Sequence, residues 1–173
     1  PRYDFLNHAL SLGLDILWRR AAARRVGRGG TGPPPAILDL CCGTGDLSLA
    51  LSGRGSVVGC DFCHPMLVRA RAKAERGGPS SRAVRWVEGD ALDLPFAADR
   101  FAAVTVAFGV RNFADIDRGL GEIHRVLRPG GTAAVLEFSR PRGPVFGPLF
   151  GIYFRHVLPR MGDWVSGRDG AYR

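Results

Sequence analysis

The chain contains almost no lysine: 23 of its 24 basic residues are arginine, and Lys73 is the one exception. It also lacks an apolar run as long as a membrane-spanning helix needs, about 20 residues with few or no charges. Its most apolar window, residues 144–165, is interrupted by prolines and two arginines. The lack of a long apolar run excludes a spanning helix. The near absence of lysine indicates a compositional bias of the source genome, and the many arginines are not by themselves a signature of nucleic-acid binding.

Charge is balanced over the middle of the chain and in excess at its two flanks. Residues 31–139 carry 12 basic and 12 acidic side chains, whereas 1–30 and 140–173 each carry six arginines against two aspartates, so the formal charge of +8 lies on the flanks. Basic flanks favour an anionic membrane surface or nucleic acid, and they also fit a solvated surface that keeps a protein in solution. The 173 residues, 46% apolar and 23% charged, predict a single soluble globular domain.

Four cysteines lie in two clusters, Cys41-Cys42 and Cys60-x-x-Cys63. The second spacing occurs in zinc and redox sites, but each cluster closes a predicted strand, and adjacent cysteines are poorly placed to ligate one ion together. The cysteines are better explained as small apolar side chains that pack beneath a turn. We therefore predict no metal site. The first residues show no signal-peptide pattern. With reduced thiols, this predicts a cytoplasmic protein.

Apolar runs alternate with helical patterns after an N-terminal helical segment and a linker rich in glycine and proline. The helical segment repeats leucine at positions 6, 10, 14 and 17, and the linker covers residues 25–35. The predicted strands are 36–41, 56–60, 84–88, 102–107 and 132–138, and the predicted helices are 46–52, 64–76 and 115–127. This alternation predicts an α/β fold, a mostly parallel sheet with helices on both faces. Ligands bind such a sheet at the carboxyl ends of its strands.

The first predicted strand ends in a glycine turn that enters a helix. A dinucleotide fingerprint needs three glycines, but here Gly43 and Gly45 are followed by Ser48. Two acids, Asp39 and Asp46, flank the glycines, and negative charge beside the turn suits a cation better than a pyrophosphate. S-adenosyl-L-methionine carries a sulfonium and an ammonium on an adenosine and is therefore the predicted cofactor. The alternative is an ordinary tight turn without a ligand.

Carboxylates also follow the next two predicted strands. Asp61 is placed to accept hydrogen bonds from both ribose hydroxyls. Asp90 is placed to accept from the adenine amino group, while the Ala91 backbone N–H donates to a ring nitrogen. The alternatives are an exposed strand-end carboxylate for Asp61 and a helix or turn cap for Asp90.

The fourth predicted strand ends in residues 108–113, where a methyltransferase of this architecture meets its acceptor. An Asn-Pro-Pro-Tyr-like motif is absent there, which argues against an exocyclic amine of DNA as the acceptor. Arg111 and Asn112 offer a cation and an amide, and a cation suits a phenolate or enolate whose ring carbon becomes the nucleophile. Alternatively, Arg111 is a structural ion-pair partner of Asp115 or Asp117.

Several motifs together carry a family resemblance. They are Tyr3-Asp4-x-x-Asn7, Trp18-Arg19-Arg20, Leu38-Asp39-Leu40-x-x-Gly43-Thr44-Gly45-Asp46-Leu47, Phe108-Gly109-Val110-Arg111-Asn112, Arg125-Val126-Leu127-Arg128-Pro129-Gly130-Gly131, Glu137-Phe138-Ser139-x-Pro141 and His156-Val157-Leu158-Pro159-Arg160. Residues 37–139 resemble class I S-adenosylmethionine methyltransferases. Essentially the whole chain is similar to the ubiquinone/menaquinone biosynthesis C-methyltransferase family, which includes demethylmenaquinone methyltransferases. The first and fourth motifs are the most specific.

The resemblance implies a Rossmann-like class I methyltransferase fold and a set of site residues. The predicted cofactor-binding residues are Asp39, Gly43, Thr44, Gly45, Asp61, Asp90, Ala91 and Ala107. Ala107 stands where the family often has serine, so a side-chain contact is lost there, and Asp90 stands where asparagine is common. The predicted catalytic residues are Arg111 and Asn112, and the predicted substrate-binding residues are Tyr3, Asn7, Phe108 and Tyr153.

The implied reaction is methyl transfer from S-adenosylmethionine to a ring carbon of a demethylated, prenylated quinol: demethylmenaquinol, or the corresponding ubiquinone precursor. The chain would divide into an N-terminal helical cap (1–30), a cofactor-binding domain (31–139) and a substrate-side lid (140–173). The apolar residues 145–153 either cover the prenyl tail or pack as core. Family members continue into a further helix and closing strands, so we expect a truncated chain in which those C-terminal strands are missing.

The implied partners are the quinol and, through the basic flanks, the inner face of the membrane, which the protein would bind peripherally from the cytoplasm. A homodimer is one possible assembly, and nucleic acid is not expected as a partner. Two alternatives stay open. One is a nucleic-acid or other small-molecule methyltransferase, and the other is a catalytically inactive fragment that binds S-adenosylmethionine.

Overall fold

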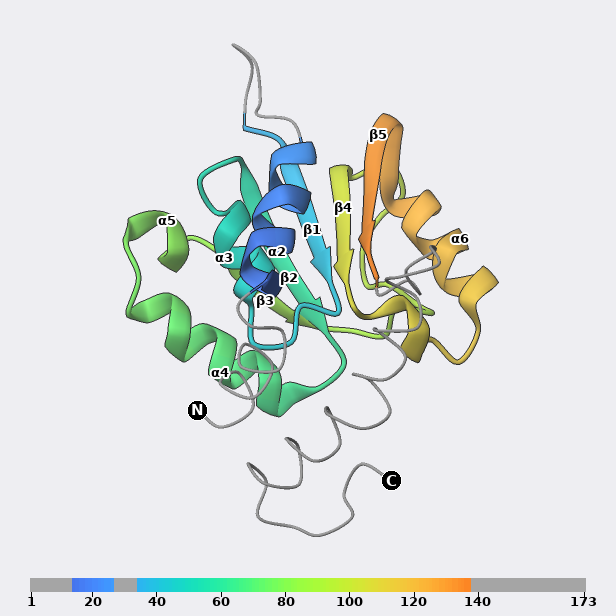
Figure 1. Cartoon of the computed structure of the whole chain (residues 1–173). Coiled ribbons are helices and arrows are strands. Elements are labelled where there is room, and N and C mark those ends of the chain that lie inside the picture. Colours follow the sequence, from blue (N-terminus) through green and yellow to red (C-terminus); the bar gives the residue numbers. More distant parts are fainter. Residues whose placement is uncertain (1–13, 27–33, 138–173) are drawn as a thin grey trace, which may run out of the picture. The chain divides into compact units, whose positions relative to one another are not determined.

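A computed structural model describes residues 14–26 and 34–137 of the chain (Figure 1). Residues 18–137 form one compact unit, and the two ends of the chain form a second unit. Of the second unit, only residues 14–17 are described. The site described below therefore lies entirely within the first unit.

Three predicted substrate-binding residues, Tyr3, Asn7 and Tyr153, lie outside the described residues. The predicted lid at 140–173 lies outside them as well. The division into cap, cofactor domain and lid stays a prediction.

Five parallel strands form one sheet in the order β3-β2-β1-β4-β5 (Figure 1). The strands are β1 (Ala36–Leu40), β2 (Ser56–Asp61), β3 (Arg85–Glu88), β4 (Phe101–Ala107) and β5 (Leu127–Leu136). The helices are α2 (Leu14–Arg25), α3 (Asp46–Leu51), α4 (His64–Glu75), α5 (Pro79–Arg82), the 3-10 helix η1 (Val110–Asn112) and α6 (Ile116–Val126). The predicted strands agree with the observed ones to within two residues, except at the start of β5.

Helices cover both faces of the sheet. Neighbouring residues of a strand point to opposite faces, and Ile37 and Leu38 of β1 accordingly belong to different hydrophobic clusters. The cluster around Ile37 includes Ala23 of α2 and Leu51 of α3, whereas the cluster around Leu38 includes Ile123 of α6. The predicted α/β class, a parallel sheet with helices on both faces, is confirmed.

The start of β5 differs from the prediction, which ended the last helix at residue 127 and began the last strand at residue 132, with Pro129-Gly130-Gly131 between them. Leu127 follows α6 directly and pairs with Phe101 of β4, and the register then shifts before Thr132 pairs with Ala103. Gly130, whose φ is +73°, lies within the shifted stretch. The proline and glycines therefore form an irregularity inside the strand, because β4 offers pairing on both sides of them.

The strand order reverses between β1 and β4. From β1 the chain moves outward to β2 and β3, and it then returns to β4 and β5 on the other side. In open α/β sheets this reversal creates the crevice at the carboxyl ends of the strands where ligands bind. Here the two segments that follow those strand ends are residues 41–45 and 108–112, the predicted cofactor turn and the predicted acceptor segment.

Candidate functional site

The turn after β1 has an uncommon backbone conformation. Cys41, Gly43 and Gly45 have φ values of +54°, +54° and +82°, a region that side chains disfavour. The Gly45 N–H donates to the Cys42 carbonyl oxygen (2.8 Å) and closes the turn. A Cβ on Gly45 would lie 2.5 Å from the Trp86 ring, whereas a Cβ on Gly43 would meet nothing within 4 Å. Gly45 therefore lets the turn pack onto the sheet, and Gly43 leaves space for a ligand.

Asp61, the last residue of β2, fastens this turn. Its Oδ2 accepts a hydrogen bond from the Gly43 N–H (2.8 Å), and its Oδ1 accepts one from the Cys63 N–H (2.9 Å). The side chain is buried, so the alternative of an exposed strand-end carboxylate is wrong. A carboxylate has about four acceptor positions, so these two backbone bonds do not exhaust the capacity for ribose hydroxyls.

Phe62, next to Asp61, is a candidate that the sequence reasoning missed. It is 73% exposed, although phenylalanine is usually buried. An aromatic face beside a predicted nucleoside site offers a stacking surface for a base. The signal in the sequence was a large aromatic residue directly after a strand-end acid.

Asp39, on β1, lies beneath the turn and is only 1% exposed. Its two carboxylate oxygens accept hydrogen bonds from the Ser48 hydroxyl of α3 (2.5 Å) and from the Thr105 hydroxyl of β4 (2.8 Å). Burial raises the pKa of this carboxyl from 3.8 to about 6, and the two hydroxyl bonds lower it only in part. The observed role of Asp39 is to join β1, α3 and β4 under the turn.

Asp46, the first residue of α3, is paired with two cations. Its Oδ1 accepts from the Lys73 Nζ (2.8 Å), and its Oδ2 accepts from an Arg19 guanidinium nitrogen (3.3 Å). These three side chains carry a formal net charge of +1. The argument that an acid beside the turn selects a cationic ligand therefore fails for Asp46, because its charge is compensated by residues remote in the sequence.

Arg19, on α2, links the cofactor turn to the acceptor side. Besides its pair with Asp46, its guanidinium carbon lies 5.7 Å from the centre of the Phe108 ring, a cation–π distance. Phe108 follows Ala107 at the end of β4 and has a φ of +60°. Its backbone N–H donates to the Leu136 carbonyl oxygen (2.7 Å), which holds that conformation. In the sequence, Arg19 stands out only as part of a family motif, and no local pattern indicates this position.

The predicted acceptor segment packs directly on the cofactor turn. A Cβ on Gly109 would lie 2.5 Å from the Cys41 Cβ, so the two backbones approach as closely as a glycine allows. Arg111 lies on η1 and pairs with Glu137 (3.8 Å), which also accepts a bond from the Arg111 N–H (3.4 Å). The Asn112 N–H donates to the Gly109 carbonyl oxygen (3.0 Å). The structure thus joins residues 41 and 109, more than sixty positions apart in the sequence.

Asp90 and Ala91 follow β3 at the same edge of the sheet. The Asp90 Oδ1 accepts from the Leu92 N–H (2.9 Å), and its carbonyl oxygen accepts from the Asp93 N–H (3.1 Å). One oxygen of this exposed carboxylate therefore caps the turn, which was the alternative role considered for Asp90. Ala91 is buried, so its contribution to a ligand would come from its backbone.

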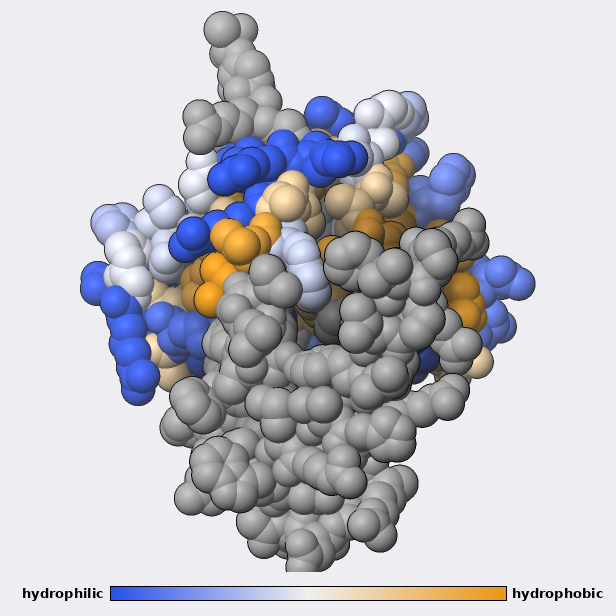
Figure 2. Space-filling model, in the orientation of Figure 1, coloured by the Kyte–Doolittle hydropathy of each residue, from blue (hydrophilic) through white to orange (hydrophobic). Residues whose placement is uncertain are grey.

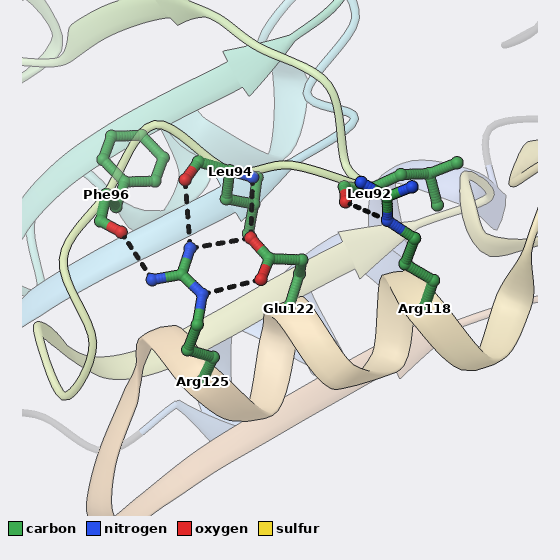
Figure 3. Close-up of polar contacts among 6 residues, drawn as sticks. All are labelled: Leu92, Leu94, Phe96, Arg118, Glu122 and Arg125. Carbon is green, nitrogen blue, oxygen red and sulfur yellow. Dashed lines mark hydrogen bonds and ion pairs between the residues drawn. The ribbon is translucent and has the colours of Figure 1, made fainter.

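Side chains of α6 hold the loop that follows Ala91 (Figure 3). Glu122 accepts a bond from the Leu94 N–H (2.7 Å), and Arg125 donates to the carbonyl oxygens of Leu94 (3.0 Å) and Phe96 (2.8 Å). Arg125 also donates to Glu122 (2.6 Å) and lowers the pKa of that carboxyl. Through these bonds α6 fixes the loop that follows Asp90 and Ala91, the two residues predicted to contact the adenine.

The cysteines beneath the turn have unreactive surroundings. Burial raises the pKa of the Cys41 and Cys60 thiols to about 12, and it also raises that of Cys42. Such thiols stay protonated near neutral pH, which fits their interpretation as packing residues. Among residues 14–26 and 34–137, no group of three or more His, Cys, Asp or Glu side chains is placed to hold a metal ion.

Comparisons with known proteins connect this geometry to a chemistry. A family model described as the ubiE/COQ5 methyltransferase family matches residues 1–173. A demethylmenaquinone methyltransferase of Thermus thermophilus is 52% identical over all of this chain and 77% of its own length. A ubiquinone/menaquinone biosynthesis C-methyltransferase UbiE of a Geobacter species is 42% identical over all of this chain and 73% of its own length. Among solved structures, a Bacillus halodurans protein assigned as a methyltransferase superposes with a TM-score of 0.64, at 26% identity over 81% of this chain and 60% of its own.

Proposed function

The chain belongs to the ubiE/COQ5 methyltransferase family, and we propose that it transfers a methyl group from S-adenosylmethionine to a ring carbon of a demethylated, prenylated quinol. Its fold is that of the Rossmann-like class I methyltransferases, and its relatives methylate quinone precursors with S-adenosylmethionine. One observation carries the acceptor half of the proposal. The segment at 108–112 packs on the cofactor turn through Gly109 and Cys41, so a methyl donor at the turn and an acceptor at that segment would be neighbours.

The residues at the turn fit S-adenosylmethionine. Gly43 leaves open space, and Asp61 holds the turn with carboxylate oxygens that also suit ribose hydroxyls. Phe62 offers a face for the adenine, and Asp90 and the Ala91 backbone lie at the next strand end. When bound, the cofactor supplies an electrophilic methyl group on a sulfonium. In this proposal the chain orients the nucleoside and keeps the methyl group on the side of β4.

The acceptor chemistry assigns a charge-stabilising role to Arg111. A quinol ring carbon becomes a good nucleophile when a ring hydroxyl loses its proton, because the phenolate oxygen shares its electrons with the ring. A guanidinium beside that oxygen stabilises the phenolate. Arg111 is about half exposed, and Glu137 holds it at the end of β4 and β5. Asn112 would orient the same oxygen, and Phe108 would cover the apolar part of the ring.

Purified chain, S-adenosylmethionine and a short-chain demethylmenaquinol test the proposal, with the methylated quinol measured by mass spectrometry. We expect Arg111→Ala to lower kcat about 100- to 1,000-fold, as for other preorganised groups that stabilise an anion, with the affinity for S-adenosylhomocysteine unchanged. Arg128→Ala is the matched control, because Arg128 lies near the start of β5, away from the carboxyl edge. Turnover of Arg111→Ala within threefold of wild type would contradict the role of Arg111. Absence of any quinol methylation by the wild type would contradict the function.

A peripheral membrane location is part of the proposal, because a prenylated quinol resides in lipid. Helix α2 exposes Trp18 together with Arg20, Arg24 and Arg25, a combination suited to anionic headgroups. Figure 2 shows apolar and strongly hydrophilic surface side by side on the described part of this face. None of the described helices has the length and apolarity to cross a bilayer.

Sedimentation with anionic and zwitterionic vesicles tests the membrane proposal. We expect binding to anionic vesicles that weakens with salt, and Arg20→Glu together with Arg24→Glu to reduce it at least tenfold, at about 1 kcal/mol for each basic residue near the surface. Equal binding to both vesicle types would contradict it. Light scattering on the protein without vesicles tests whether it forms a homodimer.

A further inference from the structure

Lys73 occupies a special place in a chain whose other 23 basic residues are arginine. It lies on α4, and its Nζ reaches the cofactor turn, where it donates to the Thr44 hydroxyl oxygen (3.2 Å) and to the Asp46 carboxylate (2.8 Å). Both partners are more than 25 positions away in the sequence. The side chain is 31% exposed, so its charge is only partly solvated.

The chemistry of these contacts favours lysine over arginine. An ammonium is a compact charge with three donors and no acceptor, whereas a guanidinium is a planar fork on a longer stem. Because Lys73 can only donate, the Thr44 oxygen must accept, and the hydroxyl proton of Thr44 points away from Nζ. Lys73 thereby sets the direction in which the Thr44 hydroxyl donates.

The turn also depends on this cation for its charge balance. Asp46 begins α3 immediately after Gly45, and its carboxylate is held by Lys73 on one oxygen and by Arg19 on the other. Without Lys73, a partly buried carboxylate would lose its shorter charge-assisted bond. The start of α3 would then lose one of the contacts that fix it beside the turn.

We propose that Lys73 is a positioning residue of the cofactor site, which orients the Thr44 hydroxyl and fixes Asp46 at the glycine turn, and that arginine cannot replace it. The inference rests on the cofactor half of the proposed function and not on the identity of the methyl acceptor. It concerns a residue outside the motifs that define the turn. Lys73 acts through Thr44 and Asp46 and need not touch the cofactor itself.

Calorimetric titration with S-adenosylhomocysteine, the product form of the cofactor, tests the proposal on the full chain. We expect Lys73→Met to raise Kd about 10- to 100-fold, the usual effect of losing a hydrogen bond to a charged group. Lys73→Arg should raise Kd at least fivefold while keeping Tm close to that of wild type, because it preserves the charge but not the two-partner geometry. Arg71→Met, an exposed position on the same helix, is the matched control and should stay within twofold.

A double-mutant cycle with Thr44→Val separates positioning from a general loss of stability. Because Lys73 acts partly through Thr44, Lys73→Met should raise Kd by a clearly smaller factor in the Thr44→Val background than in wild type, where only the contact with Asp46 is left to lose. Full additivity of the two losses would overturn the proposal, as would a Kd of Lys73→Arg equal to that of wild type.

A measurement on the wild type keeps the proposal testable even if Lys73→Met does not fold. With ¹³C-labelled lysine, the untagged chain gives one side-chain εCH₂ signal, because Lys73 is its only lysine. We expect S-adenosylhomocysteine to shift that signal, and an unchanged signal at saturation would overturn the proposal. Cofactor binding without methylation of any quinol would contradict the proposed acceptor and leave the Lys73 role intact, whereas a wild type that binds no cofactor would overturn both.

Discussion

Replacing Asp39 by asparagine should stabilise the protein above pH 6 and change little near pH 4. Asp39 is a buried carboxyl whose pKa is raised from 3.8 to about 6 by burial. In the native state it therefore binds a proton more tightly than in the unfolded chain, and the free energy of unfolding falls as pH rises between the two values. The pKa difference between 3.8 and about 6 lowers the free energy of unfolding by about 3 kcal/mol at pH 7 and above.

Asparagine can take over the hydrogen bonds without the charge. Its amide oxygen can accept from Ser48, and its amide N–H can donate to Thr105. The Thr105 hydroxyl also lies 3.4 Å from the Leu38 carbonyl oxygen, so it can turn and donate there instead. Some loss is expected because a neutral acceptor binds a hydroxyl less strongly than a carboxylate does. We therefore expect a net gain of about 1–3 kcal/mol at pH 8.

Urea unfolding at intervals from pH 4.5 to pH 8 measures this effect, with the difference between variant and wild type plotted against pH. Asp117→Asn, an exposed acid on α6, is the control and should give a nearly constant difference. A difference for Asp39→Asn that does not change with pH would refute the reasoning, and so would a variant less stable than wild type at pH 8. The affinity for S-adenosylhomocysteine should stay within threefold, because both carboxylate oxygens are bonded to hydroxyls beneath the turn.

Three further predictions follow from the contacts around the site. Arg19→Met removes a partly buried cation from Asp46 and from the Phe108 ring, and it should raise the KM for quinol about five- to thirtyfold in steady-state assays. The exposed Arg71 of α4 is the control, and Arg71→Met should have no such effect. Gly109→Ala places a Cβ 2.5 Å from the Cys41 Cβ, and it should lower stability by about 1–3 kcal/mol in urea unfolding and weaken cofactor binding. Unchanged stability would contradict the close packing of the two segments. The buried thiols beneath the turn should react with iodoacetamide at pH 8 much more slowly in the native than in the unfolded protein, as followed by mass spectrometry, and rapid native labelling there would contradict their raised pKa.

The course of the sheet could be predicted because its signals are local. Strands β1, β2 and β4 are short, mostly apolar runs, and the observed ends of β1 to β4 fall within two residues of the predicted ones. The start of β5 could not be predicted in this way. Whether a Pro-Gly-Gly stretch leaves a sheet or remains in it depends on the pairing that β4 offers to Leu127, a contact that no local pattern contains.

In the candidate site, too, some contacts could be predicted from local sequence patterns and others could not. The meeting of Gly43 and Asp61 was predictable, because parallel strands bring their carboxyl ends to one edge. The positions of Arg19 and Lys73 were not, because each reaches the turn from a helix that is remote in the sequence. A long side chain covers several ångströms in directions that depend on helix packing, so its partner cannot be inferred from spacing alone.

The two acids of the glycine motif show why charge in a motif is a weak guide to the charge of a ligand. Asp39 is buried beneath the turn, where its carboxyl has a raised pKa and accepts hydrogen bonds from two hydroxyls. The negative charge of Asp46 is paired with two cations. Both of these cations come from helices that are remote from the motif in the sequence, Arg19 from α2 and Lys73 from α4. The acids of the motif therefore do not by themselves select a cationic ligand, because Asp39 is bonded to hydroxyls beneath the turn and Asp46 is paired with cations. The predictive part of the pattern is the carboxylate of Asp61, which is buried and holds the turn by accepting a hydrogen bond from the Gly43 N–H.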